Sequence, residues 1–227
     1  MNDRLGAWAR RAVWALPVYG VLLAVGTITQ QPDYRTDFAA YADYVTSSTF
    51  LASHLIASIA GAAVGLIGMT ALCVLTAQVS PKRARWGFVS SAFGQVGLAS
   101  IFGVAAFGQP AIGRAFLDGE RAIAEAINAD VYGSPLFATA SLSLLAFVAG
   151  GVLLGGAARR VGTWSRWTAV TFTTSITVFA IGVFVEVPFL QPLAAIGLTV
   201  AGVVIARAAG VPDREGTAAF ADEVTVG

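Results

Sequence analysis

The stretch TSSTFLASHLIASIAGAAVGLIGM, residues 46–69, contains no charged side chain. A helix needs about 20 consecutive apolar residues to cross the hydrocarbon core of a bilayer, so this stretch predicts a membrane-spanning helix. It also contains His54, the only histidine in the chain. The stretch therefore indicates the fold class and raises a question about function, namely whether His54 belongs to a site or is a tolerated polar group.

The composition of the whole chain also indicates an integral membrane protein. Of its 227 residues, 56% are hydrophobic and 12% are charged, and the mean hydropathy is +0.74. Soluble domains contain about 25% charged residues. Cys73 is the only cysteine, so we expect neither a disulfide framework nor a thiolate metal cluster. The net charge of +1 gives no sign of nucleic-acid binding.

The gaps between charged residues locate the spans, because charges are costly in hydrocarbon. Glu186 is the only charged residue between Arg166 and Arg207, and the prolines beside it predict a turn between two spans. We therefore predict an all-α bundle of six transmembrane helices in one domain, residues 1–208, with a flexible tail over 209–227. The expected spans are residues 12–29, 47–78, 87–108, 135–158, 167–185 and 189–207.

The distribution of basic residues predicts the orientation of the bundle. With both termini in the cytoplasm, the outer segments contain only Arg35, Arg114 and Arg121, and all other basic residues lie inside, as the positive-inside rule requires. All five tryptophans fall at the predicted inner ends. The apolar run after MNDRLGAWARR resembles a signal sequence, but no small-x-small cleavage site follows it, so we expect a retained anchor helix.

Two segments outside the expected spans have helical periodicity. Residues 114–131 place Phe116, Ile123 and Ile127 on one face, which predicts a short amphipathic helix on the outer side. A lid packed on the outer ends of the bundle is favoured over a partner-binding surface. The aromatic residues before Ser47 similarly predict an interfacial stretch leading into the second span.

Small residues predict where the helices pack against each other. Helices in lipid approach closely where glycines face each other, because lipid tails provide no hydrophobic drive for association. Gly61 and Gly65 form one GxxxG pair, and Gly151 and Gly155 form another. We expect these pairs to mediate packing within the bundle.

Five polar residues form the candidate site. His54 lies in the outer part of its predicted span, and Glu186 ends the fifth span on the same side. An intramembrane ionisable residue is a functional candidate by default. With Gln95, Gln109 and Gln191 these residues would line an outward-facing polar pocket. The alternative is that His54 bonds a serine or a carbonyl group while Glu186 faces water.

The sequence contains no catalytic motif that we recognise. HExxH, GxSxG and P-loop patterns are absent. A single histidine cannot provide bis-histidine haem ligation or a histidine-rich metal site. We therefore predict no catalytic residue, no metal and no cofactor, and we lean against an enzyme without excluding one.

Three segments support a resemblance to known sequences. They are STFLASHLIASIAGAAVGLIGMTALCVL (48–75), RRVGTWSRWTAVTF (159–172) and PLAAIGLTVAGVVIAR (192–207). In their layout they resemble uncharacterised six-helix bacterial membrane protein families, classed as domains of unknown function. The resemblance covers most of the chain and implies a bacterial cytoplasmic (inner) membrane location, but no established activity.

Two functions remain as hypotheses. The first is a non-enzymatic inner-membrane protein that serves as a lipid-facing or partner-associated component of the envelope. The alternative is a small transporter or permease that uses the pocket around His54, Gln95 and Glu186. Membrane lipids are the expected partners, a protein partner is left open, and no nucleic-acid partner is expected.

Overall fold

The computed structural model describes residues 3–183, 185 and 187–210, and its regular elements are all helices. The predicted tail beyond residue 210 and Glu186 lie outside the described residues. In chain order the elements are α1 (Asp3–Ala12), α2 (Ala15–Ile28), α3 (Phe38–Val45), α4 (Ser48–Ala52), the π-helix η1 (Ser53–Ala60), α5 (Gly61–Thr76), α6 (Pro81–Leu117), α7 (Arg121–Val131), α8 (Ser134–Ala158), α9 (Arg166–Ile181) and α10 (Leu190–Ala209).

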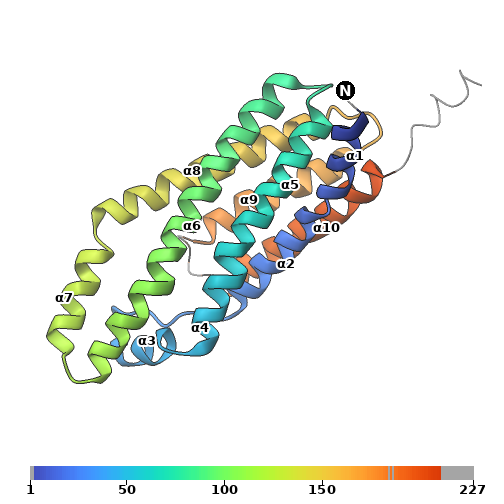
Figure 1. Cartoon of the computed structure of the whole chain (residues 1–227). Helices are drawn as coiled ribbons and strands as arrows, with labels where there is room; N and C mark the ends of the chain where they lie inside the picture. Colours follow the sequence, from blue (N-terminus) through green and yellow to red (C-terminus); the bar gives the residue numbers. More distant parts are fainter. Residues whose placement is uncertain (1–2, 184, 186, 211–227) are drawn as a thin grey trace, which may run out of the picture.

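Six long elements form a closed ring, in which each helix packs against the next. The order around the ring is α2, α5, α6, α8, α9 and α10, and α10 packs against α2 to close it. These helices run along the length of the molecule, while the short helices α3, α4 and α7 gather at one end (Figure 1). The interior of the ring is therefore bounded by helices far apart in sequence.

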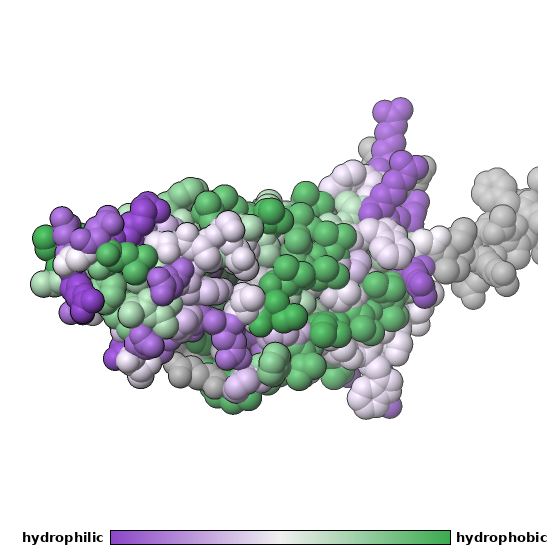
Figure 2. Space-filling model, turned by 90° about the horizontal axis from the view of Figure 1, so that it is seen from below, coloured by the Kyte–Doolittle hydropathy of each residue, from purple (hydrophilic) through white to green (hydrophobic). Residues whose placement is uncertain are grey.

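The described part of the chain contains five helical stretches long and apolar enough to cross a membrane. They are Arg4–Ile28, Ser48–Thr76, Pro81–Leu117, Ser134–Ala158 and Leu190–Ala209. Figure 2 shows an apolar band on the surface between two hydrophilic ends, as expected for a protein surrounded by lipid. These features support a helical membrane protein.

The sixth expected span, residues 167–185, corresponds to the shorter helix α9. This helix has 16 residues and ends at Ile181. At 1.5 Å per residue it is about 24 Å long, less than the roughly 30 Å of a typical hydrocarbon core. The six-span count therefore stays a prediction.

The helix α6 extends well beyond the expected span of residues 87–108. It has 37 residues and continues through Pro110 to Leu117. The extension is stabilised by packing, since Ile112 and Phe116 are buried against Ala42 of α3. The amphipathic helix expected over 114–131 is consequently observed as α7 alone. It follows a turn at Gly119, whose φ of 96° suits glycine.

The short helices close one end of the ring, which we call the cap (α3, α7 and residues 109–117 of α6). The Tyr41 hydroxyl of α3 donates a hydrogen bond to Oδ1 of Asn128 in α7 over 3.2 Å, and both side chains are buried. Phe38 stacks on Phe116 with 4.7 Å between ring centroids. The segments at this end thus form a packed lid, with their own polar and aromatic contacts.

The charged side chains are segregated between the two ends of the bundle. Among the residues whose side chains are described, every carboxylate lies at the cap end: Asp33, Asp37, Asp43, Asp118, Glu120, Glu125 and Asp130. The opposite end, which we call the basic end, holds Arg4, Arg10, Arg11, Lys82, Arg83, Arg85, Arg159, Arg160, Arg166 and Arg207. Both ends are hydrophilic, but only at the basic end are the described charged side chains all cationic.

The glycines singled out in the sequence lie at helix contacts of different closeness. A Cβ at Gly65 would lie 3.0 Å from the Tyr19 ring, and one at Gly151 would lie 2.8 Å from Ile176. Gly155 lies against Thr173 of α9, and a Cβ there would clash with the threonine hydroxyl. At Gly61 the nearest atom, on Leu22, is at an ordinary 3.5 Å. Gly65, Gly151 and Gly155 thus allow close approach, and Gly61 does not require it.

Candidate functional site

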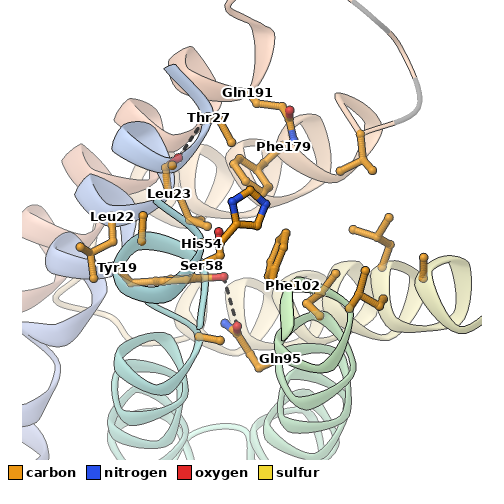
Figure 3. Close-up of a pocket in the computed structure, with 18 residues that line it drawn as sticks. Tyr19, Leu22, Leu23, Thr27, His54, Ser58, Gln95, Phe102, Phe179 and Gln191 are labelled. Atoms are coloured by element: carbon orange, nitrogen blue, oxygen red, sulfur yellow. Dashed lines mark hydrogen bonds between the residues drawn. The ribbon is translucent and has the colours of Figure 1, made fainter. Parts of the chain in front are cut away.

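A cavity of about 280 Å³ lies inside the ring. Each of the six ring positions contributes lining residues, so the cavity exists only when the whole bundle is assembled. Most of the wall is leucine, isoleucine, phenylalanine and alanine. The polar lining residues are Tyr19, Thr27, His54, Ser58, Gln95 and Gln191 (Figure 3).

His54 is presented to this cavity by the π-helix η1. The Gly61 N–H bonds to the Ile56 carbonyl, five residues earlier, in the wider turn that defines a π-helix. Such turns are frequent at functional sites because they re-aim side chains that an α-helix would direct elsewhere. The second expected span is thus helical over Ser48–Thr76, but its middle is not α-helical.

Local contacts fix the orientation of the His54 ring. Its Nδ1 lies 3.0 Å from the Phe50 carbonyl oxygen, and since a carbonyl only accepts, Nδ1 carries the proton. The ring also packs 4.1 Å from the Phe50 ring, centroid to centroid, and 6.2 Å from that of Phe102. In the neutral imidazole, Nε2 is therefore an acceptor. The sequence-based alternative is a bond to a serine or a carbonyl group, and Nδ1 also lies 3.3 Å from the Ser53 hydroxyl oxygen. The ring nevertheless lines the cavity (Figure 3).

Gln95 of α6 contributes a buried amide to the wall of the same cavity. Its Oε1 accepts a hydrogen bond from the Tyr19 hydroxyl over 3.2 Å. Its Nε2 has no hydrogen-bond partner among the described residues, although the side chain is only 2% exposed. A Cβ at Gly65 would lie 2.6 Å from this nitrogen, so the glycine makes room for it. An unpartnered amide at a cavity wall is available to a ligand, since burying it without a bond is costly.

The cavity brings together three of the five residues expected at the site, His54, Gln95 and Gln191. Gln109 is in a different place, buried in the cap near Tyr132. It follows Gln95 by 14 residues on one helix, which separates them by about 21 Å. Gln109 therefore does not line this cavity. Glu186 lies outside the described residues, so its pairing with His54 stays a prediction.

Three polar lining residues were missed by the sequence analysis. Ser58 follows His54 by four residues, and helical spacing was enough to place both on one face. Tyr19 and Thr27 lie on α2, and no sequence signal shows which face of that helix meets the cavity. Thr27 donates to the Leu23 carbonyl over 2.8 Å, so its hydroxyl oxygen keeps acceptor capacity.

The described lining suits a neutral ligand and offers no metal chemistry. None of the described residues that line the cavity is an aspartate, glutamate, lysine or arginine. Within the same described part of the chain, no three His, Cys, Asp or Glu side chains are grouped so that they would hold a metal ion. The arrangement provides hydrogen-bond acceptors and donors on an otherwise apolar wall.

The fold and the cavity together define the class of protein: an all-helical chain with membrane-length apolar helices around an internal, mostly apolar cavity. Comparison of the chain with models of protein families, with curated proteins and with solved structures gives no match.

Proposed function

We propose that the protein is a non-enzymatic membrane protein that binds a neutral, mainly apolar molecule with a hydroxyl or similar group in the cavity inside the ring. One observation carries this proposal: two unlike polar groups, His54 and the buried Gln95 amide, line one apolar cavity. A hydroxyl both donates and accepts, so it can bond to the His54 Nε2 acceptor or to the Gln95 Nε2 donor.

The size and lining of the cavity support this ligand class. Small-molecule pockets have volumes of about 300–1,000 Å³ and are mostly apolar, with a few placed polar groups. The cavity, at about 280 Å³, lies at the small end of that range. A charged ligand would enter without a described counter-charge, at a large desolvation cost.

The membrane arrangement is part of the proposal. We place the protein in a bacterial cytoplasmic membrane, with α9 as a short sixth span and both termini in the cytoplasm. The basic end, whose described charged side chains are all cationic, supports this orientation through the positive-inside rule. A short span is accommodated by local thinning of the bilayer and by interfacial anchors, and Arg166 and Trp167 lie at the start of α9.

The permease hypothesis requires a path from the cavity to the basic end. The helix packing between the cavity and the basic end disfavours such a path. A Cβ at Gly68 would lie 2.9 Å from the Leu16 backbone nitrogen, so α5 and α2 are in close contact there. A Cβ at Gly65 would similarly lie 3.0 Å from the Tyr19 ring. We therefore favour binding over passage.

Binding can be tested with 1-decanol and decane, which share an apolar chain and differ in the hydroxyl. We expect decanol to raise the thermal unfolding temperature of the full chain in detergent micelles more than decane does at the same mole fraction. The substitution His54→Phe keeps an aromatic ring but removes Nε2. It should weaken decanol binding about fivefold, as expected for one net hydrogen bond, and leave decane binding unchanged.

A matched control is Ser100→Ala on α6. The Ser100 side chain is exposed and donates to the Val96 carbonyl of its own helix, so its loss should change neither ligand. The proposal fails if wild-type protein does not distinguish the two probes, or if neither His54→Phe nor Gln95→Met binds decanol more weakly than wild type does.

A further inference from the structure

A second cavity lies at the basic end and is independent of the one inside the ring. It has a volume of about 350 Å³ and lies along α8, with α6 on one side and α9 on the other. We call it the basic groove. Its polar lining is Arg83 of α6, Arg159 at the end of α8, and Thr173 and Thr174 of α9.

Arg83 is held in place at the groove by the neighbouring helix. Its Nη1 donates to the Gly156 carbonyl of α8 over 3.3 Å. A Cβ at Gly156 would lie 3.3 Å from the same nitrogen, so a larger residue would displace the guanidinium. A guanidinium has five N–H donors in a planar fork, and this contact leaves others for a ligand.

The electrostatics of the groove favour an anion. Arg159 adds a second cation, and the described side chains of the basic end include no carboxylate that would neutralise the pair. Guanidinium groups bind phosphate oxygens in a bidentate manner, with charge-assisted bonds stronger than neutral ones. The threonine hydroxyls provide further donors.

The rest of the groove is apolar and opens toward the lipid-facing surface. Val152 of α8 is 46% exposed and Val170 of α9 is 38% exposed. Trp86 on α6 and Trp167 on α9 are also exposed, and each lies beside an arginine of its own helix. Exposed tryptophans mark the headgroup level of a bilayer. The groove therefore passes from cations at headgroup level to apolar side chains deeper along the helices.

We propose that the basic groove binds one anionic phospholipid, with its phosphate between Arg83 and Arg159 and an acyl chain on Val152 and Val170. Basic pockets between transmembrane helices suit lipid headgroups, because each cation near the surface attracts an anionic lipid. The apolar floor favours a lipid over a soluble phosphate, since only a lipid has a chain to cover it.

Native mass spectrometry of the purified full chain, with dioleoylphosphatidylglycerol or dioleoylphosphatidylcholine added to the micelles, tests this site. We expect one phosphatidylglycerol to bind at least about tenfold more tightly than phosphatidylcholine. The double variant R83Q/R159Q should abolish this preference. Arg159 is exposed at the end of its helix, so R159Q alone should fold normally and reduce the preference about fivefold.

The control is R85Q/R160Q, which removes the same charge at exposed positions outside the groove, two residues from Arg83 on α6 and next to Arg159 after α8. It should keep the preference within about twofold of wild type, because surface charges away from the site act only diffusely. Equal losses in both double variants would overturn the proposal in favour of diffuse attraction. Displacement of phosphatidylglycerol by inorganic phosphate at equal concentration would overturn it in favour of a soluble-anion site, as would the absence of any preference in wild type.

Discussion

Tyr19 donates a hydrogen bond to Gln95 across the interior of the ring, joining α2 to α6 over the intervening helix α5. Tyr19 is the cavity-lining residue of α2 that lies closest to the basic end, and Gln95 is the corresponding residue of α6. The bond therefore forms the floor of the cavity. The same interaction stabilises the fold and leaves Gln95 Nε2 as a buried donor at the cavity wall without a hydrogen-bond partner among the described residues.

Replacing Tyr19 by phenylalanine should destabilise the protein by about 1–2 kcal/mol, because it leaves Gln95 buried with both ends of its amide unpaired. The double variant Tyr19→Phe with Gln95→Met removes both partners and should recover most of that loss. The measurement is the free energy of unfolding in detergent for the wild type, both single variants and the double variant. Additive single effects would show that the bond contributes nothing.

The positions of the membrane-length helices could be predicted because ions are excluded from hydrocarbon. Hydropathy could not predict where those helices end. The α6 helix continues past its apolar part to Leu117 because the cap buries Ile112 and Phe116, a tertiary effect that local sequence does not show. Pro110, which predicts a break, lies inside the helix without ending it.

The candidate site was only partly predictable. His54, Gln95 and Gln191 stood out because polar side chains are rare within spans. The π-helix around His54 could not be foreseen, since a shift of one residue in the hydrogen-bond pattern leaves composition and hydropathy unchanged. Tyr19 was missed because the order of helices around the ring determines which residues meet.

Replacing Asn128 by alanine should loosen the cap without unfolding the ring. The Tyr41 hydroxyl would stay buried without its acceptor, which costs about 1–3 kcal/mol. We expect amide hydrogen exchange in α3 and α7 to become about tenfold faster, while exchange in α8 and α10 stays the same. The exposed neighbour Asp130→Asn is the control and should leave all rates near wild type. Uniform acceleration in every helix would contradict a separately packed cap.

Alkaline pH should open the same cap. Burial raises the pKa of Tyr132, which lies between α7 and α8, to about 12. The unfolded value is about 10, so the folded state holds the phenol proton more tightly. Its contribution to stability is complete below about pH 10 and is lost as the pH rises through about 12.

Replacing Tyr132 by phenylalanine should reduce this loss between about pH 10 and pH 12, since a ring without a hydroxyl cannot ionise. Some loss should remain, because burial also raises the pKa of Tyr41. Hydrogen exchange of α7 across this range measures the effect. An unchanged pH profile in Tyr132→Phe would place the titrating group elsewhere.

Alanine substitutions at two glycines of α6 separate the effect of close helix packing on stability from the effect of helix propensity. A Cβ at Gly94 would lie 2.5 Å from the Phe147 backbone nitrogen of α8, whereas a Cβ at Gly103 would meet nothing within 4 Å. Both lie inside α6, so alanine gains the same intrinsic helix propensity, up to about 1 kcal/mol. Gly94→Ala should nevertheless destabilise the protein by about 1–3 kcal/mol, because backbone atoms of α8 would have to shift. Gly103→Ala should be neutral or stabilising. Equal unfolding free energies for the two variants in detergent would contradict the close α6–α8 contact on which the ring depends.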